Sequence, residues 1–128
     1  MAEYVIERRV DADVPETIAR VKEALAAEGF GVLTEIDIKA KLKEKLDVDF
    51  RPYVILGACH PASAYEALSR EISIGVLLPC NVVVHEEEIG TAVKAVRPTV
   101  SLAATGRQDL CELGEEVEGR LRRAVESL

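Results

Sequence analysis

Apolar positions recur along the chain with periods that divide it into short strands and helices. Residues 3–10 (EYVIERRV) are rich in β-branched and aromatic residues and predict a strand. The next segment predicts a helix that runs to about residue 28, because its apolar residues recur at helical spacing: Val14, Ile18, Val21 and Leu25. Asp13 and Glu16 have the spacing of a capping box, and Gly29 suits a left-handed residue after the helix.

The middle of the chain continues this alternation. Residues 30–38 and 52–59 predict two further strands, and residues 39–46 predict a short helix between them. Pro61 is expected to open a helix that extends to about residue 71. Residues 75–87 (GVLLPCNVVVHEE) predict one long strand with a bulge at Pro79, since proline cannot donate to a ladder.

A turn and a final helix complete the pattern. Ile89 and Gly90 are expected to turn the chain into a paired strand that ends near Arg97. Residues 97–107 predict an irregular crossing, and the last helix is expected to start near Asp109 with Glu112 as its capping partner. The order strand, helix, strand, short helix, strand, helix, strand, strand, helix predicts one α+β domain over residues 1–128. Its sheet is expected to be mainly antiparallel, with helices packed on one face.

Two of the predicted strands have no polar face. Residues 53–58 (YVILGA) and 76–84 (VLLPCNVVV) are apolar at odd and at even positions, which is typical of strands buried on both sides. The helices cover only one side of the sheet, so the crossing, a second copy of the chain or a small apolar ligand must cover the other. A homodimer is the leading expectation.

The overall charge excludes some partners. The formal net charge is −7 and the isoelectric point is about 4.9, which argues against nucleic acids and anionic membranes. No apolar run approaches the roughly 20 residues of a membrane-spanning helix, and the N-terminus lacks a signal pattern. We therefore expect a cytoplasmic protein. Asn81 and Gln108 are the only side-chain amides, which indicates a thermophile or a biased genome composition.

Residues 28–61 (EGFGVLTEIDIKAKLKEKLDVDFRPYVILGACHP) and residues 74–84 (IGVLLPCNVVV) closely resemble the bacterial and archaeal family called domain of unknown function 302. The resemblance extends to the final amphipathic helix. It implies a single α+β domain similar to the TATA-binding-protein-like folds, and a dimer. It implies neither DNA binding nor an activity. His60 departs from the family pattern, in which asparagine is more common, whereas Cys59 and Cys80 match it.

The cysteines are the first candidate site. Cys59 precedes the expected N-cap, His60, and the positive end of a helix dipole favours a thiolate there. A small buried core residue is the alternative for Cys59 and for Cys80. A four-ligand site with His85 is disfavoured, because Cys80 and His85 should point to opposite faces of a strand. The sequence still allows a smaller site in which Cys59, Cys80 and His60 hold a soft ion such as zinc or copper(I). Such a site can lie within one chain or be shared across a dimer.

Carboxylates are the second candidate. Glu35 and Asp37 should share one face of a strand, where they form a possible polar site, although Asp37 can also simply cap the following helix. The acidic run at residues 85–88 is typical of a solvated edge. No nucleophile stands beside these groups, and no catalytic residue is assigned.

Two functional hypotheses follow. The first is a homodimeric binding or interaction module without catalytic activity, with an apolar site on the sheet or at the dimer junction. The second is a thiol-based redox or soft-metal-binding protein that uses Cys59 and Cys80. An enzyme that uses Glu35 or Asp37 ranks behind both. No cofactor follows from the sequence.

Overall fold

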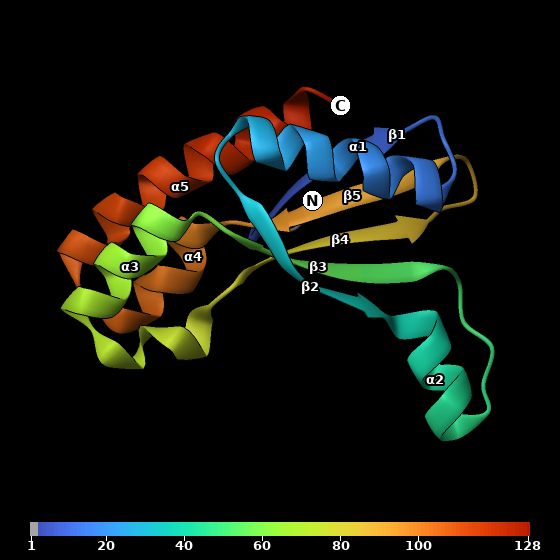
Figure 1. Ribbon diagram of the computed structural model, residues 1–128, viewed down its shortest axis with the longest axis horizontal. Helices are drawn as coiled ribbons and strands as arrows, with labels where there is room; N and C mark the ends of the chain where they lie inside the picture. The colour runs from blue at the N-terminus through green and yellow to red at the C-terminus, as the bar shows by residue number, and fades with distance from the viewer. Residues whose placement is uncertain (1–2) are drawn as a thin grey trace.

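The computed structural model describes residues 3–128 and contains a five-stranded antiparallel sheet (Figure 1). Across the sheet the strands lie in the order β1 (Val5–Val10), β5 (Thr91–Val96), β4 (Cys80–Glu86), β3 (Tyr53–Cys59) and β2 (Gly31–Asp37). Every neighbouring pair is antiparallel. The predicted α+β class, with a mainly antiparallel sheet, is confirmed.

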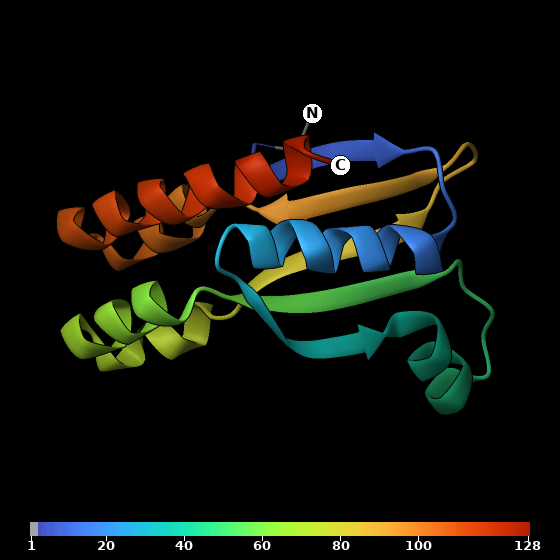
Figure 2. The same ribbon diagram turned by 45° about the horizontal axis from the view of Figure 1, so that its top comes forward.

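Two long helices cover one face of this sheet: α1 (Val14–Ala27) and α5 (Gln108–Glu126) (Figure 2). The main core lies between them and the sheet, where Leu25, Leu56, Val82 and Leu121 are almost fully buried. Because the side chains of a strand alternate between faces, every second residue of β3, β4 and β5 enters this core. None of the described helices is long and apolar enough to cross a membrane.

The N-cap and the terminal glycine predicted for α1 are confirmed, while the Glu16 carboxylate of the predicted capping box pairs with Arg20. The Asp13 carboxylate accepts a hydrogen bond of 2.9 Å from the backbone N–H of Glu16, which satisfies one free donor of the first turn. Gly29 follows the helix with a φ of +85°, a conformation that glycine adopts without strain. Phe30 is thereby turned into the core.

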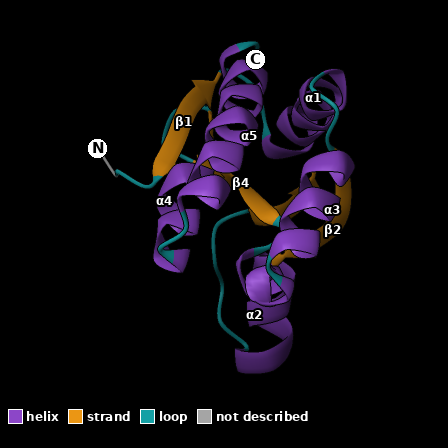
Figure 3. Cartoon of the chain, turned by 90° about the vertical axis from the view of Figure 1, so that its left-hand side faces the viewer, coloured by secondary structure: helices purple, strands orange, loops and turns teal. Residues whose placement is uncertain are grey.

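Beyond one end of the sheet lies a second group of helices: α3 (Pro61–Arg70), η1 (Ile72–Leu77), α4 (Pro98–Leu102) and η2 (Ala103–Thr105). Seen from this end, α3 and α4 lie on either side of α5 (Figure 3). Their apolar residues form a second, smaller core cluster with α5: Ala67, Ile74, Leu102, Leu110 and Leu113. The predicted irregular crossing at residues 97–107 is therefore largely helical.

The prediction of one long strand over residues 75–87 is wrong. The strand begins only at Cys80, and residues 72–77 form the 3₁₀ helix η1 instead. Pro79 has no N–H to continue the ladder, so pairing starts after it, with Cys80 opposite Ala58. Ile74 is 1% exposed in the second cluster, whereas Val76 in the same 3₁₀ helix is 87% exposed.

The predicted cap of the last helix is also wrong. The helix α5 starts at Gln108, and its N-cap residue, Arg107, makes no side-chain capping bond. Asp109 lies inside the first turn, where its carboxylate accepts hydrogen bonds from the Arg107 guanidinium. A carboxylate in a first helical turn is also favoured by the helix dipole.

No helix of residues 3–128 lies over the second face of the sheet. The cross-strand register places Ile36, Ile55 and Val83 in one row on this face, followed by Lys94 and Glu7. The crossing at residues 97–107 does not cover the row, because α4 packs against α5. The helix α2 (Ile38–Leu46), which Asp37 caps as predicted, projects away from α1 and α5 and has no buried residue (Figure 1).

Candidate binding site

An apolar cavity of about 280 Å³ lies where the sheet meets the second group of helices. One wall comes from α3 and η1, with Ala64, Ala67 and Leu77, and the opposite wall comes from α4 and α5, with Leu102 and Leu113. Among the described residues that line the cavity, none is Asp, Glu, Lys or Arg. An uncharged apolar lining favours an uncharged apolar ligand, because a charged ligand would lose its hydration without a partner.

The ends of β3 and β4 contribute both candidate cysteines to this cavity. Cys59 is the last residue of β3 and Cys80 is the first residue of β4, so the two neighbouring strands bring them to the same end of the sheet. Both residues line the cavity, both are half-buried, and their thiols are free rather than joined in a disulfide.

The thiol of Cys80 is held in its neutral form. Burial raises its pKa to about 11, and the neighbouring Cys59 adds to this effect because two thiolates repel each other. A thiol with this pKa is protonated at neutral pH and is a poor nucleophile. Reactivity at the cavity would therefore have to come from Cys59 rather than from Cys80.

His60 acts as the N-cap of α3, as predicted. Its Nδ1 lies 2.8 Å from the Ser63 hydroxyl oxygen and accepts a longer bond of 3.4 Å from the Ser63 backbone N–H. The ring also meets the edge of Phe30, with the ring centroids 5.6 Å apart. These contacts give His60 a structural role at the cavity rim.

The described part of the chain does not assemble a metal centre from these residues. No group of three or more His, Cys, Asp and Glu side chains suited to a metal ion occurs within residues 3–128. His85 lies away from the cysteines: its ring is stacked on Tyr53 at a centroid distance of 5.2 Å, near the opposite end of β3 and β4. Cys59 and Cys80 thus remain a pair of thiols without a third ligand from the described residues.

Glu35 and Asp37 lie together, but away from the thiols. They line an acidic hollow near the start of α1 and the β4–β5 hairpin, with Asp11, Asp13 and Glu87. Glu35 makes an ion pair of 2.6 Å with Lys22, and Asp37 accepts a hydrogen bond of 2.9 Å from the Ala40 N–H as the cap of α2. Both carboxylates therefore have structural partners, and neither a serine nor a cysteine is among the described residues that line the hollow.

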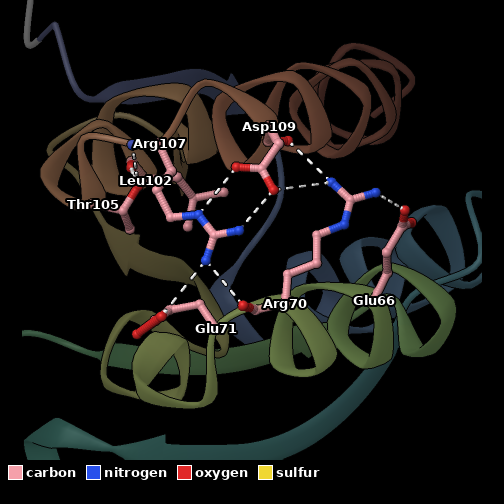
Figure 4. Close-up of polar contacts among 7 residues, drawn as sticks. All are labelled: Glu66, Arg70, Glu71, Leu102, Thr105, Arg107 and Asp109. Carbon is pink, nitrogen blue, oxygen red and sulfur yellow. Dashed lines mark hydrogen bonds and ion pairs between the residues drawn. The ribbon is translucent and has the colours of Figure 1, made fainter.

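Sequence reasoning missed the polar residues that join the two walls of the cavity. Arg107 and Asp109 at the start of α5 reach Arg70 and Glu71 at the end of α3 (Figure 4). The hydrogen bonds from Arg107 hold the pKa of the Asp109 carboxyl below its usual range, and Asp109 raises that of Arg107 in turn. The sequence predicted only a helix cap at Asp109. It contained no signal that the end of α3 lies beside the start of α5.

The comparisons with known proteins agree with this architecture. The family model described as "Domain of unknown function DUF302" matches residues 6–128. The chain is also similar to the structure titled "Crystal structure of uncharacterized conserved protein DUF302 from Bacillus stearothermophilus", with 34% sequence identity, 98% of each chain covered and a TM-score of 0.91. Among curated proteins, none matches the sequence. The match over nearly the whole chain, in sequence and in fold, shows that this protein belongs to the DUF302 family.

Proposed function

We propose that this protein is a non-catalytic binding module whose cavity between α3–η1 and α4–α5 holds a small, uncharged, apolar ligand. The observation that carries the proposal is the cavity lining, which is apolar apart from two serines, His60 and the two thiols. A volume of about 280 Å³ is close to the lower end of the usual range for small-molecule sites, about 300–1,000 Å³. Burial of an apolar ligand in such a site contributes free energy in proportion to the area removed from water.

The neutral fluorophore N-phenyl-1-naphthylamine tests this function, because its emission increases in an apolar site. We expect saturable binding to the natural protein. Ala64 is half-buried on the α3 wall, so Ala64→Phe fills the cavity and should weaken binding about tenfold or more. Ala62 is exposed on the same helix outside the lining, and Ala62→Phe should leave binding within about twofold.

The two variants separate a cavity ligand from adsorption elsewhere. Circular dichroism and thermal unfolding establish that both variants are folded before their affinities are compared. Equal weakening in Ala62→Phe and Ala64→Phe, or undiminished binding in Ala64→Phe, would place the probe outside the cavity. Absence of saturable binding to the natural protein would overturn the proposal.

A second candidate function is thiol-based soft-metal binding, and the observation that favours it is that Cys59 and Cys80 line the same cavity. Thiolates are the ligands that copper(I) prefers, and a bound ion would favour the deprotonated form of Cys80. Copper(I) titration against a competing chelator should then show one site that Cys80→Ser removes. Cys111 lies outside the cavity lining, so Cys111→Ser is the matched control. Equal copper(I) affinity in all three proteins would contradict this function.

Self-association is the remaining part of the proposed function. It is supported by the apolar row of Ile36, Ile55 and Val83, over which no described helix packs, and by α2, none of whose apolar residues is fully buried. A nine-residue helix is marginal in water without packing, so α2 needs a partner surface. A second copy related by a two-fold axis offers both surfaces at once. The oligomeric state in solution tests this part.

A further inference from the structure

The segment formed by α3 and η1, residues 61–77, is attached to the sheet only at its two ends. It leaves β3 after Cys59 and returns to β4 at Cys80, so both attachments lie at the same end of the sheet. Apart from contacts between α3 and η1 themselves, the main packing partner of α3 is α5. We call residues 61–77 the flap, because they form one wall of the cavity and face α4 and α5 across it.

Polar contacts hold the free end of the flap to the opposite wall (Figure 4). Arg107 Nη1 donates a hydrogen bond of 2.9 Å to the Arg70 carbonyl oxygen and lies 3.6 Å from Glu71 Oε2. Arg70 Nη1 in turn lies 3.7 Å from Asp109 Oδ2 and donates a bond of 3.4 Å to the Asp109 carbonyl oxygen. We call Arg70, Glu71, Arg107 and Asp109 the latch.

The arrangement of the latch is stiff on both sides. Arg107 is fixed by two hydrogen bonds to the Asp109 carboxylate, at 3.1 Å from Nε and 2.9 Å from Nη2. Arg70 is also paired with Glu66 one turn earlier on α3. Planar guanidinium groups that make paired bonds lose little further freedom when they bind a carbonyl or a carboxylate. The latch therefore joins two pre-ordered helix ends.

The apolar part of the same contact is small. Within the second core cluster the flap contributes Ala67 and Ile74, together with the partly buried Leu77. Side chains of the latch are between about one third and one half exposed, so salt screens their attraction. A contact of few apolar groups and several exposed charges can open without unfolding the main core between the sheet, α1 and α5.

We propose that the flap opens as a unit to admit and release the cavity ligand, and that the latch sets how often it opens. This inference rests on the proposed ligand-binding function of the cavity. Opening moves the α3 wall away from Leu102 and Leu113 on the other wall, which exposes the cavity along its length. The closed state excludes water and is the state that holds the ligand.

Hydrogen–deuterium exchange tests the opening without any ligand. In Arg107→Gln, which removes the bonds to Arg70, Glu71 and Asp109, amides of residues 61–77 should exchange about threefold or more faster than in the natural protein. Amides of α1 should be unchanged. Arg20→Gln breaks an exposed ion pair with Glu16 on α1 and is the matched control. Asp109→Asn is a second variant, should Arg107→Gln fold poorly.

Stopped-flow kinetics with N-phenyl-1-naphthylamine test the consequence for exchange. Both association and dissociation should be about threefold or more faster in Arg107→Gln, and added sodium chloride should accelerate exchange in the natural protein more than in the variant. Unchanged amide exchange in the flap, or equal rates in Arg107→Gln and Arg20→Gln, would overturn the latch while leaving the binding function intact. Faster flap exchange without probe binding would support the moving flap and contradict the proposed ligand.

Discussion

The carboxylate of Glu118 has more polar partners than any other carboxylate in the described chain. It is 8% exposed and accepts hydrogen bonds from the Thr99 hydroxyl at 2.6 Å, the Thr99 N–H at 3.2 Å and the Arg97 guanidinium at 3.1 Å. Burial raises the pKa of Glu118, but the hydrogen bonds from Thr99 and the attraction of Arg97 outweigh it. The pKa therefore lies below its ordinary value of 4.5.

We expect Glu118→Gln to lower the free energy of unfolding by about 1–3 kcal/mol at neutral pH, because it weakens charged hydrogen bonds in a buried place. The folded-state pKa is lowered, so this stabilisation is present above 4.5 and is lost as the pH falls through the folded-state value. Urea unfolding from about pH 7 to about pH 3 measures the effect.

The exposed Glu116 provides the control for this prediction. It pairs with Arg120 within one turn of α5 and is 59% exposed, so Glu116→Gln should change the stability by less than about 0.5 kcal/mol. The difference between the natural protein and Glu118→Gln should shrink as the pH falls. A difference that is constant over the whole range would contradict the assigned cause.

Local residue signals were predictable because they act within one turn. Asp13, Asp37 and His60 were expected to cap helices, and each accepts a hydrogen bond from the backbone N–H three residues later. The role of Glu118 was not predictable, because its partners Arg97 and Thr99 precede it by about twenty residues and meet it only when α4 packs on α5.

Among the elements, the helix α2 and the second face of the sheet both expose apolar side chains. Apolar side chains on both are exposed: Ile36 at 41% in β2 and Leu46 at 66% at the end of α2. Phe50, 41% exposed, extends this apolar surface towards Tyr53 in β3. These exposed groups are the reason for the proposed association of two copies.

We expect sedimentation equilibrium at micromolar concentration to show a dimer of the natural protein that Ile36→Lys weakens about tenfold or more. Lysine in this row leaves the folded chain intact but places a charge in the proposed contact, where its burial is costly. Tyr65→Lys is the control, because Tyr65 is an exposed aromatic residue on α3, away from the row. A monomeric natural protein would contradict the association.

The prediction of elements failed where an apolar segment had two possible structures. Residues 74–78 are apolar at every position except Gly75, so their pattern suits a buried strand or a helix on a core. Pro79 ended the ladder and left this segment as η1, with Ile74 in the second cluster. Residues 98–105 carry too few helical turns for a periodicity to be visible, although they form α4 and η2.

The whole molecule has an uneven distribution of apolar surface. One face of the sheet lies under α1 and α5, while no helix among the described residues packs over the other. The cavity arises beyond the end of the sheet, where α3–η1 and α4–α5 extend past the strands and enclose space between them. The residues that line it are drawn from three parts of the chain: residue 33, the range 58–80 and the range 98–117.

The sequence by itself determined the order of the five strands and of the longer helices, the caps of α1, α2 and α3, and the apolar side of α1 that packs on the core. These features follow from interactions between residues at most a few positions apart, or from periodic burial. The apolar two-sided strands also predicted a face that needs a cover. The family followed from long stretches of similar residues.

Only the tertiary structure decided where the chemistry lies. Cys59 and Cys80 meet at one cavity because β3 and β4 are neighbours in an antiparallel ladder, while Glu35 and Asp37 lie in a separate acidic hollow. The latch joins Arg70 to Asp109 across 39 positions of sequence. Such contacts depend on how the two helical walls pack, and no local pattern records that packing.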